Sequence, residues 1–234
     1  SDSKTEWCRA AFWCIKNTLM LAELQSYIAN IYDAECGHQL HDYLITDRGL
    51  ANRLGRKALP GNIEESVLIA EDKSGIALSV FLDEALLSRL DNADPMNRLR
   101  ADQLGDLAVV LEGISHFNYL GWCAGKNKSV TLLELELQAE IDKFVTTALL
   151  AQEQEEFSLL RNLHKLLFDN IVYQPTLNRL ERERYELANN YAARFCRRLL
   201  ERVSRENGNV QLREFYRLPQ SEKMSYIHTL AWEN

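Results

Sequence analysis

Residues 104–125, LGDLAVVLEGISHFNYLGWCAG, constrain the fold of this chain more than any other stretch. Asp106 and Glu112 carry its only formal charges. A helix that is apolar on nearly every side is normally enclosed by the rest of the protein. Glu112, His116 and Asn118 leave no uncharged run of about 18 residues, so a membrane span is not expected. We therefore predict a buried central helix.

A second helix is predicted directly after the first. The connection contains Gly125, Asn127 and two lysines, a mixture typical of a turn between helices. Thr131 and Glu134 then form a capping-box pattern, in which each side chain can bond to a free amide of the first helical turn. Because the turn is short, the two helices are expected to be antiparallel neighbours, giving a central helical hairpin over about 103–150.

The polar side of this hairpin carries groups that suit a chemical site. Glu112 and His116 are four residues apart, so they share one face of the first helix. Glu136 and Glu140 have the same spacing beside the inward stripe of the second helix. We predict that these four side chains converge, with His164 from a later helix as a possible fifth member. Carboxylates and imidazoles on facing helices are the ligands of a bundle metal site.

Two interpretations of this cluster stay open. In the first, Glu112 or Glu140 is a metal ligand or general base, and His116 is a ligand or acid–base group. In the second, the groups are structural: Glu112 pairs with His116 or an arginine, and Glu136 and Glu140 reach solvent or Lys143. The two Glu-x-x-His pairs of ferritin-like di-iron bundles are missing, so neither a family nor a cofactor is assigned.

Other motifs are weaker. Cys36-Gly-His-x-x-His41 offers three zinc ligands without an evident fourth. The arginines of residues 194–205 are interrupted by Glu201 and followed by Glu206, a mixture typical of a self-paired, solvated face, so nucleic-acid binding is not expected. Cys123 follows His116 by seven residues, but no third group that would orient a thiol–base pair is evident. No Walker, GxGxxG, GxSxG or HExxH motif occurs.

The remaining patterns predict a mainly α, bundle-like fold. Apolar and polar residues partly alternate in residues 66–70 and 76–82, and a polar turn with Gly75 lies between the two runs. This pattern predicts one small β-hairpin over about 66–82, within an inserted segment of about 64–82. A long helix is expected over 7–32, with its pattern continuing to about 45. No linker rich in Gly, Pro or Ser divides the 234 residues, so we expect one domain over 1–234.

Helix starts and further helices are also predicted. Thr46 is expected to cap a short helix through residue 54, and Asp83 another short helix. A helix is expected over about 153–172, and Thr176 is expected to cap a long one reaching about residue 205. Two short helices, separated by Pro219, are expected to close the chain.

Composition favours a cytoplasmic protein. The five cysteines are odd in number and scattered, without a CxxC pair, which fits reduced thiols better than a disulfide framework. The net charge of −7 disfavours an acidic partner such as nucleic acid, and no secretory signal is recognised. Amphipathic helices without a catalytic motif suggest a protein-interaction or regulatory module that binds a second copy of itself, as a dimer, or another protein. The alternative is a metal-binding or acid–base enzyme using the carboxylate–histidine cluster.

Overall fold

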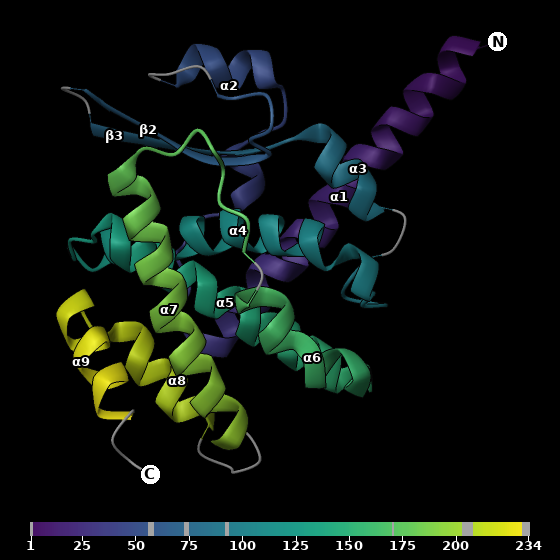
Figure 1. Ribbon diagram of the computed structural model, residues 1–234. Helices are drawn as coiled ribbons and strands as arrows, with labels where there is room; N and C mark the ends of the chain where they lie inside the picture. Colours follow the sequence, from purple (N-terminus) through teal and green to yellow (C-terminus); the bar gives the residue numbers. More distant parts are fainter. Residues whose placement is uncertain are drawn as a thin grey trace. The chain divides into compact units, whose positions relative to one another are not determined.

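The computed structural model describes residues 2–55, 59–72, 75–91, 94–169, 171–202 and 208–230 (Figure 1). Across these ranges the chain is 69% helical, with nine helices and a three-stranded mixed sheet, so the predicted mainly α fold class is confirmed. No helix in these ranges has the length and apolarity that a bilayer crossing demands. The contacts define two compact units, and the assignment of residues 1–234 to one domain stays a prediction.

The first unit comprises Ser1–Ser26 and His38–Phe117 and contains the sheet. Strands β2 (Glu65–Asp72) and β3 (Gly75–Leu82) pair antiparallel, which confirms the predicted β-hairpin. Strand β1 (Leu44–Ile45) adds to the other side of β3 in parallel, giving the order β1-β3-β2.

The expected helical continuation toward residue 45 is wrong. Helix α1 (Asp2–Tyr32) ends where Asp33 takes a positive φ of 51°, and Gly37 follows with a φ of 77°. These left-handed residues end a right-handed helix. The chain then makes a 3-10 turn and enters β1, whose backbone finds its hydrogen-bond partners on β3. Pairing with a distant strand therefore overrides a local apolar period.

Aspartates begin the two short helices of the first unit. Asp47 caps α2 (Arg48–Leu54) by accepting from the amide of Leu50, one residue after the expected cap Thr46. Asp83 caps α3 (Glu84–Asp91), as predicted, by accepting from the amide of Ala85 at 2.9 Å. A carboxylate reaches the amides of a first helical turn and complements the positive end of the helix dipole.

Helix α4 (Leu104–Gly125) has a glycine, Gly113, where it packs closely against the sheet. The groups that approach Gly113 most closely come from β2 and β3. A Cβ built there would lie 3.1 Å from Leu82 Cδ2 and 3.3 Å from Val80 Cγ1. The bare backbone of Gly113 therefore lets the strands and α4 pack closely.

The second unit comprises Tyr27–Gly37 and Asn118–Asn234 and is built of helices. They are α5 (Leu132–Glu153), α6 (Phe157–Phe168), α7 (Arg179–Arg202), α8 (Gly208–Arg217) and α9 (Gln220–Leu230) (Figure 1). The helices that pack most closely on α5 are α7 and α6. The central helical hairpin over about 103–150 stays a prediction.

Capping in the second unit differs in part from expectation. Thr131 Oγ1 accepts from the Glu134 amide at 3.1 Å, as predicted, but the Glu134 carboxylate binds Tyr119 instead of completing a capping box. A full capping box occurs at the start of α7, where Asn178 and Glu181 exchange two 2.9 Å bonds, so Thr176 is not the cap. Helix α6 begins four residues later than expected, because the chain turns at Glu155 with a φ of 59°, and it ends at Phe168.

Two arginines of α8 close the end of α1. Arg213 donates to the carbonyls of Asn30 and Ile31, and Arg217 donates to those of Tyr32 and Asp33. The last carbonyls of a helix lack partners within the helix, so side-chain donors from elsewhere satisfy them. The rings of Tyr32 and Tyr216 also stack, with centroids 4.3 Å apart.

Two glycine-to-alanine variants should have opposite effects on stability. A Cβ on Gly121 would lie 2.8 Å from Cys36 Cβ, so Gly121→Ala is expected to lower the free energy of unfolding by about 1–3 kcal/mol. Gly105 has nothing within 4 Å of such a Cβ, so Gly105→Ala should raise it by roughly 0.5 kcal/mol. Urea unfolding followed by circular dichroism measures both. Equal stabilisation by the two alanines would contradict close packing at Gly121.

Candidate metal centre

Strand β2 and helix α4 bring three potential metal ligands together in the first unit. Glu65 begins β2, and Glu112 and His116 lie one helical turn apart on α4. One ligand atom from each lies within 4.8 Å of the other two. In the part of the chain that the structure describes, no other group of three or more His, Cys, Asp or Glu side chains converges in this way.

The cluster is shielded from water. His116 Nδ1 lies 3.4 Å from Glu65 Oε1, and their side chains are 7% and 11% exposed. Gly113 permits this approach, because a Cβ in its place would lie 3.2 Å from Glu65 Cγ. Charges in such a partly dry site interact more strongly than they do in bulk water.

This arrangement is chemically suited to a cation. Two carboxylates at this distance repel each other when both are ionised, and a bound cation offsets that repulsion. Carboxylate oxygen and imidazole nitrogen are ligands that zinc and other first-row divalent ions accept. Three protein ligands would leave further coordination positions for water.

The structure brings together two of the residues predicted from the sequence to form the site. Glu112 and His116 meet as expected, but their third partner, Glu65, was missed. Glu65 directly precedes the predicted β-hairpin, and no local pattern shows that this end of the strand lies against α4. The signal is a contact between residues about fifty positions apart, which helical periodicity does not encode.

The other three predicted members belong to the second unit and have partners there. Glu140 accepts from Lys143 at 2.7 Å, as in the structural interpretation. Glu136 lies 3.8 Å from Arg184. His164 Nε2 lies 2.8 Å from the carbonyl oxygen of Ala193, to which a protonated Nε2 donates.

The weaker motifs gain no support. His38 contacts the Tyr43 hydroxyl at 3.2 Å, and His41 contacts Asp42. Cys36 belongs to the second unit, where its thiol donates to Asn118 Oδ1 at 3.7 Å. Burial raises the pKa of the Cys123 thiol, which disfavours the thiolate that nucleophilic catalysis requires.

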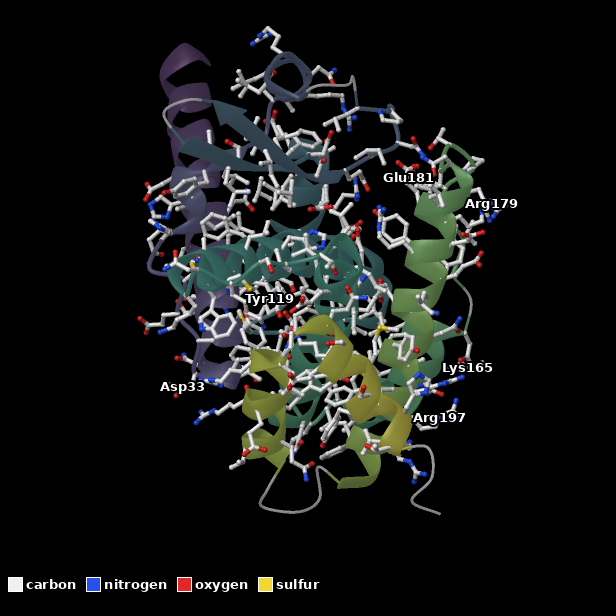
Figure 2. The ribbon with its side chains drawn as sticks, turned by 90° about the vertical axis from the view of Figure 1, so that its left-hand side faces the viewer. Asp33, Tyr119, Lys165, Arg179, Glu181 and Arg197 are labelled. Atoms are coloured by element: carbon white, nitrogen blue, oxygen red, sulfur yellow. The ribbon has the colours of Figure 1, made fainter. Side chains whose placement is uncertain are left out.

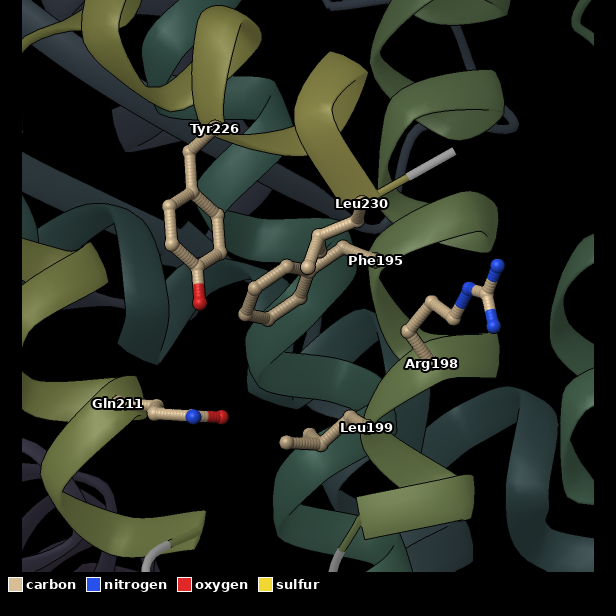
Figure 3. Close-up of a pocket in the computed structure, with 6 residues that line it drawn as sticks. All are labelled: Phe195, Arg198, Leu199, Gln211, Tyr226 and Leu230. Carbon is tan, nitrogen blue, oxygen red and sulfur yellow. The ribbon is translucent and has the colours of Figure 1, made fainter. Parts of the chain in front are cut away.

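A small apolar recess lies among α7, α8 and α9 in the second unit (Figure 3). Its lining consists of Phe195, Arg198, Leu199, Gln211, Tyr226 and Leu230. None of the candidate metal ligands lines it, and aromatic and aliphatic groups supply most of its wall. The recess therefore does not serve the Glu65–Glu112–His116 cluster.

No protein-family model, curated protein or solved structure matches this chain. Fold alone does not define an activity, so the chemistry of the site is the guide to function. The convergence of Glu65, Glu112 and His116 is the observation with the clearest chemical meaning.

Proposed function

We propose that this protein binds a divalent transition-metal ion through Glu65, Glu112 and His116. The supporting observation is the convergence of two carboxylates and an imidazole within 4.8 Å at a partly buried position. Magnesium and calcium prefer sites made of oxygen atoms, whereas an imidazole suits zinc and iron. The mixed ligand set therefore favours Zn²⁺, Fe²⁺ or Mn²⁺, and the absence of a cysteine in the group disfavours Cu⁺.

The ion would have two effects. It would join β2 to α4 and thereby stabilise the first unit, since any ligand that binds only the folded state shifts the folding equilibrium. It would also hold water in the positions that the protein leaves open, and metal coordination makes such water more acidic. The second effect is the chemical basis for the acid–base alternative that the sequence suggested.

Metal titration of the metal-free protein tests the proposal. Isothermal titration with Zn²⁺ and Mn²⁺ is expected to show one site per chain. Glu65→Gln, Glu112→Gln and His116→Ala should each weaken binding at least tenfold, because even residues that only support a ligand change affinity by roughly 10- to 100-fold. Binding that all three variants leave unchanged would refute the assignment.

Glu140→Gln and His164→Asn provide matched controls, because they remove a carboxylate and an imidazole in the second unit. Both variants should bind metal as tightly as the unaltered protein. If either weakens binding as much as Glu112→Gln does, the larger cluster expected from sequence is the site and the three-residue assignment is wrong.

Protein interaction is the second candidate function. It is supported by four large apolar side chains on and between α6 and α7 that are well exposed: Phe157, Leu166, Val172 and Leu180, at 51%, 51%, 92% and 72%. Large apolar side chains exposed to solvent can contribute to a protein-binding face when they form a contiguous patch. This role is compatible with metal binding, because the cluster lies in the first unit and these side chains lie in the second.

A further inference from the structure

Lys223 of α9 is fully enclosed within the second unit. Its relative exposure is 0%, which is rare for a lysine because an ammonium group is strongly hydrated. Lys223 Nζ donates to the Tyr119 hydroxyl at 2.9 Å and to Gln138 Oε1 at 2.7 Å. These bonds join α9 to the C-terminal part of α4 and to α5. Figure 2 shows Tyr119 among the interior side chains, while Arg197 extends outward.

Aromatic rings surround the ammonium. Lys223 Nζ lies 4.4 Å from the ring centroid of Tyr119, 5.4 Å from that of Phe215 and 5.7 Å from that of Tyr216. The negative ring faces stabilise a desolvated cation but replace only part of its lost hydration. Lys223 is therefore held firmly in a position that penalises its charge.

Two buried carboxylates are connected to Lys223 by hydrogen bonds, each through one neutral side chain. Tyr119 donates to Glu134 at 2.5 Å, and the Gln138 amide donates to Asp142 at 2.7 Å. Glu134 and Asp142 are 2% and 0% exposed. Hydrogen bonds thus relay from the ammonium to each carboxylate.

The other ionisable groups near Lys223 come from three elements. Cys123 lies on α4, Tyr216 on α8 and Lys128 in the turn before α5. Lys128 Nζ lies 3.5 Å from Glu134 Oε1 and competes for the same carboxylate. Burial lowers the pKa of Lys223 to about 7, the two carboxylates oppose this shift, and Lys128 adds to it. In an opened helix the lysine would regain its ordinary pKa in water.

We propose that Lys223 makes the docking of α9 onto α4 and α5 a proton-linked latch, which holds more tightly as the pH rises above neutral. The closed state buries an uncharged amine above about pH 7, whereas the open state exposes an ammonium until about pH 10.5. Opening therefore takes up a proton within this window. The opening equilibrium constant should fall tenfold per pH unit from about 7 to 10.5 and be independent of this group below 7.

Hydrogen exchange of the full chain tests the latch. Exchange rates of α9 amides, divided by the intrinsic rate at each pH, should give an opening constant that falls about tenfold per unit between pH 7.5 and 9.5. Lys223→Met should abolish this slope. Lys165→Met, at an exposed position of α6, should retain it. If the opening constant of Lys223→Met has the same pH dependence as that of the unaltered protein, the dependence does not come from Lys223 and the proposal is wrong.

Direct titration keeps the proposal testable if Lys223→Met does not fold. Carbon-13 NMR of the lysine ε-carbons in the unaltered protein should show one residue that titrates near pH 7, while exposed lysines titrate near their ordinary value of about 10.4. If every lysine ε-carbon titrates at that ordinary value, the latch does not exist.

Discussion

Replacing Glu134 with alanine is expected to lower the free energy of unfolding by about 3 kcal/mol. The carboxylate of Glu134 is 2% exposed, accepts from Tyr119 and faces the ammonium of Lys128. Its removal leaves the buried Tyr119 hydroxyl without its acceptor and Lys128 without its carboxylate partner, and breaking a buried polar network from one side is costly. Urea unfolding followed by circular dichroism measures the loss, and the pKa of Lys223 should fall further in the same variant.

Glu134→Gln is the conservative control. It keeps an acceptor for the Tyr119 hydroxyl while removing the charge, so a loss of about 1–2 kcal/mol is expected. Glu183→Ala serves as a surface control, because this glutamate is 54% exposed and pairs with Arg179 on the same helix. Its effect should stay below about 0.5 kcal/mol. Similar values for Glu134→Ala and Glu183→Ala would contradict an energetic role for the buried network.

Replacing Phe144 with alanine is expected to cost about 3–5 kcal/mol in the free energy of unfolding. The Phe144 side chain of α5 is 1% exposed, and its ring centroid lies 5.8 Å from that of Phe168 and 6.1 Å from that of His164. Truncation removes apolar contacts and leaves a cavity where α5 meets α6. The midpoint of urea unfolding should therefore shift strongly downward.

Leu166→Ala is the matched control for Phe144→Ala. Leu166 lies on α6 but is 51% exposed, so its truncation should change stability by less than about 0.5 kcal/mol. Phe144→Leu, which keeps most of the apolar volume, should cost less than the alanine variant. A loss below about 1 kcal/mol for Phe144→Ala would show that the α5–α6 packing adapts to the missing ring.

Local patterns were sufficient for most of the fold. The buried helix α4, the β2–β3 hairpin and the cap at Asp83 each depend on residues close together in sequence. Strand β1 was missed because Leu44 and Ile45 become a strand only through pairing with β3. A two-residue strand has no period of its own, so its conformation depends on a long-range contact.

The candidate site also contains some residues that local spacing predicts and others that depend on distant contacts. The four-residue spacing of Glu112 and His116 predicts a shared helical face, and the structure places both in the cluster. The place of Glu65 in the cluster depends on how β2 packs against α4, which no local pattern encodes. The burial of Lys223 could not be predicted from local sequence, because its short, polar helix has the composition of a surface helix. Its burial arises from contacts with Tyr119, Gln138 and the aromatic rings of α8.

The arginine caps on α1 have a consequence for biosynthesis. Arg213 and Arg217 act on carbonyls 182 to 185 residues earlier in the chain. During synthesis the last carbonyls of α1 therefore lack these arginine donors until α8 has been translated. Contacts between residues so far apart in sequence form late in folding, so we expect this end of α1 to gain its full set of hydrogen bonds only after α8 has folded.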